Sequence, residues 1–148
     1  MSKKIAVLSA SWHVSIVGSA EDAFVEAMVD AGYDRESIKV IKVPGALEIP
    51  LAGKIALQNG FDIAVGVGFV TDGKIYHREY VAHTVVQSIL DVSIATDKPF
   101  LSVVLAPQNY TEGDEDDEAW FVDHMKIKGK EAAEACMQML NVIPEIKV

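Results

Sequence analysis

The sequence contains a single cysteine, Cys136, among its 148 residues. One cysteine cannot build an intramolecular disulfide framework, and such low cysteine use is typical of proteins in a reducing compartment. The chain also lacks any run near the roughly 18 apolar residues of a transmembrane helix. Its N-terminal apolar run is shorter than a signal-peptide core and continues into a strand pattern. We therefore expect a cytoplasmic protein that does not bind membranes.

Basic residues are scarce. Lysine and arginine together number 13 against 22 aspartates and glutamates, which gives a formal net charge of −9 and a pI near 4.8. A strongly negative protein is repelled by phosphate backbones and anionic lipids, so we expect no nucleic acid partner. Half of the residues are hydrophobic, enough for one good core, and we expect residues 1–148 to form a single domain.

Motifs for metals and nucleotide cofactors are absent as well. The sequence has no C-x-x-C, H-E-x-x-H or Walker lysine motif. The glycines at Gly66–Gly68 lie inside a predicted strand, whereas a dinucleotide fingerprint opens a helix after the first strand. Glycine within a strand instead permits a close backbone approach. We expect neither a metal nor a cofactor. The acidic run Glu112–Glu118 lacks EF-hand spacing, and we predict a solvated loop before the last helix.

Four β-rich runs alternate with four amphipathic stretches. The predicted strands are Lys4–Ser9, Ile38–Val43, Ile63–Val70 and Phe100–Ala106. The predicted helices cover the apolar stripe from Ile16 to Met28, the segment Leu47–Gln58, the stripe from Val81 to Val92, and the stripe from Trp120 to Met139. This alternation predicts right-handed crossovers and a parallel sheet. The expected fold is a three-layer α/β/α domain of the flavodoxin-like kind, with a four-stranded parallel sheet flanked by helices.

Ligands of such open sheets bind outside the carboxyl ends of the strands. The segments that follow the four strands are Ser9–His13, Pro44–Glu48, Phe69–His77 and Ala106–Thr111. We expect them to converge at one edge. In the second segment, within VPGALEIP, Glu48 is predicted to lie in the first turn of a helix. A carboxylate there repels phosphate but accepts strong hydrogen bonds from hydroxyls, which favours a polyhydroxylated ligand.

Two other segments carry candidate residues. Trp12 could stack on a flat ring, a contact worth about 1–3 kcal/mol for nucleic acid bases, or it could cap the core. His77 has the imidazole suited to proton transfer at neutral pH, although a lone histidine at a helix start is more often a solvated or helix-capping residue. His83 looks like an ordinary helix residue, whereas His13 and His124 could line a site. Lys126, Lys128 and Lys130 beside His124 could hold a phosphate or form a solvated helix face.

Several of these segments together resemble the 6,7-dimethyl-8-ribityllumazine synthase family. They are VPGALEIP, GFVTDGKIYHREYV, KPFLSVVLAP and KGKEAAEA, and the resemblance extends in order from Lys4 to about Leu140. The segments SASWH, GKIYH and KIKGKEAA are more similar to the second, decameric type of this enzyme. The resemblance implies a condensation of 5-amino-6-ribitylamino-2,4(1H,3H)-pyrimidinedione with 3,4-dihydroxy-2-butanone 4-phosphate in riboflavin biosynthesis. It also implies that no cofactor takes part.

The resemblance further implies roles for individual residues. Trp12 would stack on the pyrimidine, while Ala46, Leu47 and Glu48 would hold the ribityl chain. The backbone of Phe69, Val70 and Thr71 would contact the pyrimidine edge. His77 would transfer protons, a contribution of about 10²–10⁴-fold in rate for such groups. Ser102 stands where the family has a residue from a neighbouring subunit, so a homo-oligomer, pentamer or decamer, with sites between subunits is expected.

The chain departs from the common family pattern around the phosphate. Asp72, Ile75 and Tyr76 replace an arginine and a threonine of the common type, and the arginine that usually clamps phosphate is missing. The candidates left for the phosphate region are Lys74, Ile75, His124, Lys126 and Lys128. A lysine does not restore the bidentate fork of arginine, so weaker affinity for the phosphorylated substrate is expected.

Two other functions are compatible with a small α/β domain. A non-catalytic relative that binds lumazine or flavin remains an alternative. A signalling receiver domain is excluded, because Ser9, Ala10 and Ser11 stand where that domain needs an acidic pair.

Overall fold

The computed structural model describes residues 3–148 and contains four parallel strands. They are β1 (Ile5–Ala10), β2 (Ile38–Val43), β3 (Ile63–Phe69) and β4 (Phe100–Leu105). The sheet order is β2-β1-β3-β4, and Ile5 pairs with both Ile38 and Ile63. The four predicted strands are confirmed to within one residue at each end.

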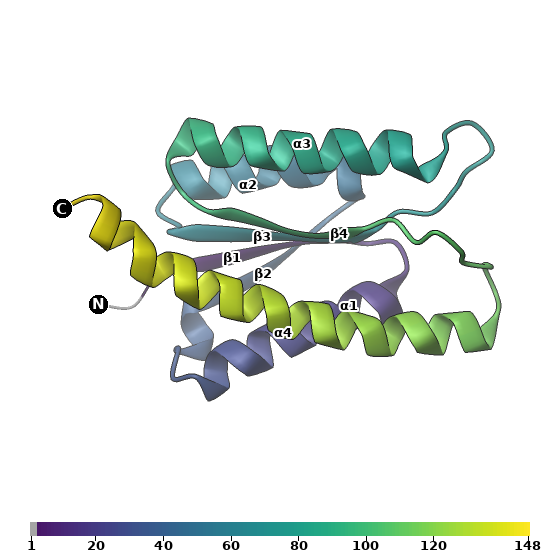
Figure 1. The fold of residues 1–148 in the computed structure, drawn as a ribbon, viewed down its shortest axis with the longest axis horizontal. Helices are drawn as coiled ribbons and strands as arrows, with labels where there is room; N and C mark the ends of the chain where they lie inside the picture. Colours follow the sequence, from purple (N-terminus) through teal and green to yellow (C-terminus); the bar gives the residue numbers. More distant parts are fainter. Residues whose placement is uncertain (1–2) are drawn as a thin grey trace.

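Four helices cover the two faces of the sheet. They are α1 (Val14–Asp30), α2 (Ile49–Gln58), α3 (Arg78–Thr96) and α4 (Glu115–Ile146). Figure 1 shows α2 and α3 on one side of the sheet and α1 and α4 on the other, so the predicted three-layer arrangement is confirmed. Short 3₁₀ turns, η1 (Arg35–Ser37) and η2 (Ala46–Glu48), precede β2 and α2. Among the described helices, none combines the length and apolar character needed to cross a membrane.

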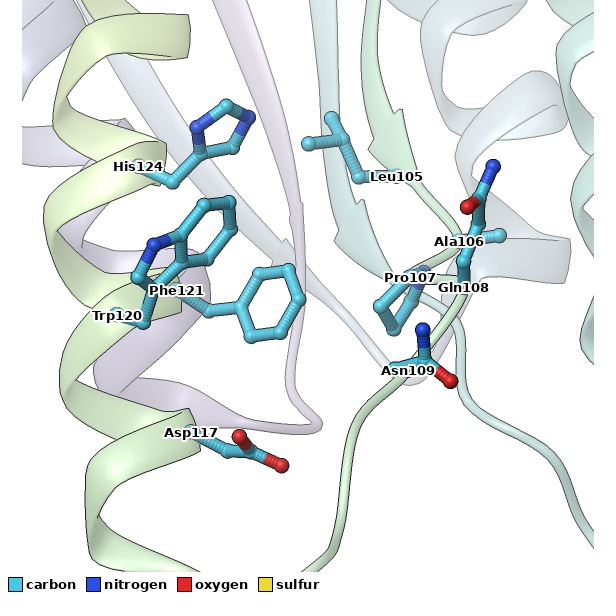
Figure 2. Close-up of a pocket in the computed structure, with 9 residues that line it drawn as sticks. All are labelled: Leu105, Ala106, Pro107, Gln108, Asn109, Asp117, Trp120, Phe121 and His124. Carbon is cyan, nitrogen blue, oxygen red and sulfur yellow. The ribbon is translucent and has the colours of Figure 1, made fainter.

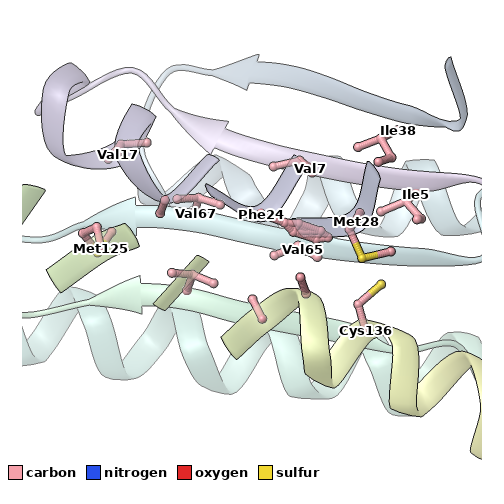
Figure 3. Packing of buried hydrophobic residues seen from close by; sticks show 14 of the residues in the cluster. Ile5, Val7, Val17, Phe24, Met28, Ile38, Val65, Val67, Met125 and Cys136 are labelled. Atoms are coloured by element: carbon pink, nitrogen blue, oxygen red, sulfur yellow. The ribbon is translucent and has the colours of Figure 1, made fainter. Parts of the chain in front are cut away.

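The core consists of two clusters, one on each face of the sheet. Alternate side chains of β1 supply both, because successive residues of a strand point to opposite faces. Ile5 and Val7 pack with α1 and α4, whereas Ala6 and Leu8 pack with α2 and α3. Figure 3 shows the first cluster, in which Cys136 lies among the apolar side chains. Its burial raises the pKa of the thiol to about 12, so this cysteine stays protonated and inert.

The glycines of β3 have the packing role expected from the sequence. A Cβ at Gly66 would lie 2.6 Å from Cγ2 of Ile49, in α2. Only glycine lets the first turn of α2 approach the sheet this closely. The approach holds α2, and the η2 turn before it, against the carboxyl end of β3.

The last helix begins earlier than predicted. The acidic run Glu112–Glu118 was expected to be a loop, but α4 starts at Glu115, inside that run. The Asp114 side chain accepts hydrogen bonds from the backbone N–H groups of Asp116 and Asp117 and so caps the helix. Negative charges in the first turn interact favourably with the positive end of the helix dipole. The loop prediction is therefore wrong from Glu115 onward.

Candidate active site

A cavity of about 430 Å³ opens at the carboxyl ends of β1, β2 and β3. We call it the rim cavity. Three of the four segments expected to converge there do so, and the fourth reaches it only through Glu112, just beyond its predicted end. Seven of the predicted residues line the cavity: Trp12, Ala46, Leu47, Glu48, Phe69, Val70 and Thr71. Ala10, His13, Gly45, Val81 and Glu112 complete the lining.

The side chains of Trp12 and Glu48 both lie beside the α-carbon of Gly45. A Cβ built on Gly45 would lie 3.5 Å from Nε1 of Trp12 and 3.3 Å from Oε1 of Glu48. Trp12 is 70% exposed, so the alternative that it caps the core is wrong. An exposed indole at the mouth of a cavity has a free face for a flat ring. Beside it, Glu48 offers carboxylate oxygens to hydroxyl donors.

Local hydrogen bonds hold these two segments together. The Ser11 hydroxyl donates to the carbonyl of Val43 at 2.8 Å, which joins the segment after β1 to the end of β2. The N–H of Glu48 donates to the carbonyl of Gly45 at 3.3 Å, closing the η2 turn. Glu48 thus ends a 3₁₀ turn directly before α2. The prediction that it lies in the first turn of the α-helix is wrong. Pro50 is tolerated in that first turn because its missing N–H has no partner there.

His77 lies outside the lining, at the N-cap of α3. In the sequence it lies between two lining residues, Thr71 and Val81. Its side chain is 56% exposed. Its Nε2 lies 3.1 Å from an N–H of Arg78. The same Nε2 lies 3.5 Å from Oδ1 of Asp72, so this nitrogen has a donor on one side and an acceptor on the other. The position of His77 as the N-cap residue is as predicted, but its side chain makes no capping hydrogen bond.

Asp72 holds the start of α3 beside His77. Its carboxylate accepts the backbone N–H of Arg78 at 2.7 Å and the guanidinium of Arg78 at 3.0 Å. The hydrogen bond from the Arg78 backbone, reinforced by the neighbouring His77 and Arg78 side chains, lowers the pKa of Asp72 below its ordinary value of 3.8. Asp72 therefore fixes the segment that carries His77.

The remaining predicted residues lie away from the rim cavity. His124 lines a second cavity of about 540 Å³ between α4 and the segment after β4. Figure 2 shows Trp120, Phe121 and His124 projecting from α4 toward that segment. Trp120 stacks on His124 with ring centroids 4.9 Å apart. The sequence predicts Trp120 to be part of an apolar helix stripe, yet it is 59% exposed.

The predicted lysine cluster is divided between different surfaces. Lys126 and Lys130 line a groove between α1 and α4, whereas Lys128 lines a hollow beside Ser102 on the edge strand β4. Residues two apart on a helix point in nearly opposite directions, while residues four apart share a face. Lys126 and Lys128 also lie near acids of their own helix, Asp123 at 3.6 Å and Glu131 at 3.1 Å.

Two further candidates of the phosphate region, Lys74 and Ile75, lie on the exposed segment between β3 and α3. Neither lines the rim cavity. Within residues 3–148, no three His, Cys, Asp or Glu side chains gather closely enough to hold a metal ion.

Comparison with known proteins shows the family to which the chain belongs. The family model described as 6,7-dimethyl-8-ribityllumazine synthase matches residues 2–144. The chain belongs to the lumazine synthase family. It is 37% identical to 6,7-dimethyl-8-ribityllumazine synthase 2 of Pseudomonas syringae pv. tomato, over 98% of this chain and 85% of that protein. It is 38% identical to 6,7-dimethyl-8-ribityllumazine synthase of Rhodococcus erythropolis, over 96% of this chain and 94% of that protein.

A third relative is 6,7-dimethyl-8-ribityllumazine synthase 2 of Bradyrhizobium diazoefficiens, 37% identical over 93% of this chain and 82% of that protein. Two of these three relatives carry the number 2 in their names, which agrees with the resemblance to the second type.

Proposed function

We propose that this chain is a 6,7-dimethyl-8-ribityllumazine synthase that acts in riboflavin biosynthesis. It condenses 5-amino-6-ribitylamino-2,4(1H,3H)-pyrimidinedione with 3,4-dihydroxy-2-butanone 4-phosphate, giving 6,7-dimethyl-8-ribityllumazine, phosphate and water. The observation that carries the proposal is the rim cavity, where an exposed indole and a carboxylate lie side by side over Gly45. A flat heterocycle with a polyhydroxylated side chain needs that pair of groups.

Each substrate group has a proposed partner in the cavity. The pyrimidine ring stacks on Trp12, and the ribityl hydroxyls donate to Glu48, beside Ala46 and Leu47. The backbone of Phe69, Val70 and Thr71 contacts the edge of the ring. The N–H of Val70 already donates to the carbonyl of Leu105 at 2.8 Å, so the ligand contacts are assigned to the other backbone groups of this segment.

The chemistry itself needs proton transfers rather than a bound cofactor. The amine attacks the ketone, water leaves to form an imine, phosphate is eliminated, and the ring closes with loss of water. We assign the proton transfers to His77, whose exposed imidazole lies beside Arg78 and Asp72 at the start of α3.

We further propose that the protein works as a homo-oligomer, a pentamer or a decamer, in which a neighbouring copy completes each site. Apolar side chains on the outer faces of α2 and α3 support an assembly, since Leu51, Ile55, Leu90 and Ile94 are all at least 50% exposed. In such an assembly Ser102 and the second cavity, with His124, would belong to the neighbour's site, and Lys126 or Lys128 would lie near it. Sedimentation would show a mass of five or ten chains of 16.1 kDa.

The proposed location is the cytoplasm. The support is the single cysteine, Cys136, which is free and buried, as is usual in a reducing compartment.

The direct test of the activity is product formation. The purified protein is mixed with both substrates, and the absorbance and fluorescence of the lumazine product are followed over time. Steady turnover supports the synthase. Tight binding of the product without turnover would favour the alternative, a non-catalytic lumazine- or flavin-binding relative, and the position of His77 outside the cavity lining gives that alternative its support.

A further inference from the structure

The rim cavity contains its own imidazole, His13, whose backbone is held in an unusual conformation. His13 has φ 52° and ψ 54°, which is the left-handed region. Side chains make this conformation unfavourable for L-residues other than glycine, and it persists only where the surroundings enforce it. Here the start of α1 enforces it, since the carbonyl of His13 accepts the N–H groups of Ile16 and Val17 at 3.0 and 2.9 Å.

The surroundings also fix the side chain. The imidazole is only 12% exposed and meets the rings of Phe69 and Tyr110 edge-on, with centroids 5.3 and 5.8 Å away. Its Nε2 lies 3.3 Å from the hydroxyl oxygen of Thr71. Its Nδ1 lies 4.0 Å from Oε1 of Glu112. The ring is thus held against two aromatic residues that also contact each other, with centroids 5.2 Å apart, and one of its nitrogens lies beside a hydroxyl of a residue that lines the cavity.

The charges of the lining indicate which substrate this part of the cavity accepts. Of the described residues that line it, two are glutamates and none is a lysine or arginine. An anionic phosphate would be repelled there, whereas an uncharged heterocycle with carbonyl and N–H groups would not. Histidine and threonine can each donate or accept, which matches the mixed hydrogen-bonding edge of a pyrimidinedione.

We propose that His13 is a specificity-determining residue for the pyrimidine substrate. Its imidazole orients the Thr71 hydroxyl, and the two side chains together contact the hydrogen-bonding edge of the ring that stacks on Trp12. This inference rests on the function proposed above, and it adds a side-chain contact to the backbone contacts assigned to residues 69–71.

Two substitutions separate this role from simple packing. His13→Phe keeps an aromatic ring against Phe69 and Tyr110 but removes both nitrogens. Thr71→Val keeps a branched side chain of similar shape but removes the hydroxyl. The matched control is Ser15→Ala, which removes a hydroxyl of α1 that donates to Glu118, outside the rim cavity.

Steady-state kinetics with both substrates give the main readout. In each single variant the KM for the pyrimidine should rise about tenfold, as expected when a site loses one hydrogen bond and leaves its partner unpaired. The double variant should lose little more than either single one, because the two side chains act as a pair. The KM for the butanone phosphate should stay within about twofold, and Ser15→Ala should match the wild type. Unchanged pyrimidine KM values, or a rise for the butanone phosphate instead, would overturn the assignment.

A second readout does not depend on turnover. The dissociation constant of 6,7-dimethyl-8-ribityllumazine should rise about tenfold in His13→Phe and in Thr71→Val. If the wild type binds this product but forms none, the proposed function fails while His13 is still tested. His13→Asn tolerates the left-handed backbone and keeps an amide for Thr71. It should bind more tightly than His13→Phe, and equal or weaker binding would also overturn the proposal.

Discussion

Trp12 and Glu48, from the segments after β1 and β2, lie against the same bare α-carbon of Gly45. A methyl group there would lie 3.5 Å from the indole nitrogen and 3.3 Å from a carboxylate oxygen. The stacking face and the acceptor for hydroxyls are therefore set relative to each other by a glycine.

Substitution Gly45→Ala tests this relationship. The added methyl group would lie closer to Oε1 of Glu48 than an ordinary contact allows, so the carboxylate must shift by a few tenths of an ångström. The KM for the pyrimidine should therefore rise, by up to the roughly tenfold expected when a binding contact is lost. The control is Gly18→Ala, whose Cβ meets nothing within 4 Å. Because alanine is favoured over glycine inside a helix, Gly18→Ala should keep full activity and gain up to about 1 kcal/mol in stability. Equal kinetics for Gly45→Ala and the wild type would contradict the proposed arrangement.

Replacement of His77 by alanine should lower kcat by about 10²–10⁴-fold, the usual contribution of a general acid–base group. Binding of the product should change little, because the imidazole lies outside the cavity lining. The control is His83→Ala, an exposed position one and a half turns further along α3, which should leave kcat unchanged. An active His77→Ala protein would remove His77 from the mechanism.

The thermal stability of the protein should depend on pH through Asp72, which holds the start of α3. Its folded-state pKa is depressed, so its stabilising effect is present above the ordinary pKa of 3.8 and is lost as the pH falls through the lower folded value. The variant Asp72→Asn keeps an acceptor for the N–H of Arg78 but lacks the charge. At pH 7 the wild type should have the higher Tm, and in strong acid the two Tm values should meet. A difference that persists in acid would show that the charge is not its cause.

The packing of α1 against α4 depends on Gly129. A Cβ at this position would collide with the carbonyl oxygen of Ala20 and approach Cβ of Ala23 to 2.9 Å. Gly129→Ala should therefore destabilise the fold by about 1–3 kcal/mol, the usual cost of overpacking. Denaturant unfolding measures this, and the same Gly18→Ala variant serves as control because it lies on α1 in open space. A stability equal to that of the wild type would show that the helices can move apart freely.

Much of this architecture could be predicted from the sequence, because strong periodic signals determine it. The apolar runs of β3 and β4 are long enough to mark strands, and alternation with amphipathic segments requires a parallel sheet. Parallel strands in turn bring the segments with Trp12, Glu48 and Thr71 to one edge. The start of α4 was missed because an acidic run is polar at every position and shows no apolar stripe, although Asp114 is a good N-cap residue.

The finer arrangement of the site could not be predicted. The sequence indicates that His13 could line a site, as it does, but the orientation of its side chain depends on its own left-handed backbone and on a contact with Thr71, 58 positions away. Neither leaves a periodic signal. The predicted cluster of lysines near the C-terminus is wrong for a different reason. Lys126 and Lys128 are close together in sequence but lie on different sides of their helix.

The central claim is that the pyrimidine-derived ring binds on Trp12. In a Trp120→Phe protein, Trp12 is the only tryptophan, since the sequence contains two. Titration with 6,7-dimethyl-8-ribityllumazine should quench its fluorescence to saturation at one ligand per chain, and Glu48→Gln should weaken that binding about tenfold, as loss of a charged acceptor predicts. Unquenched emission from Trp12 at ligand concentrations that saturate the protein in an independent binding measurement would contradict the account.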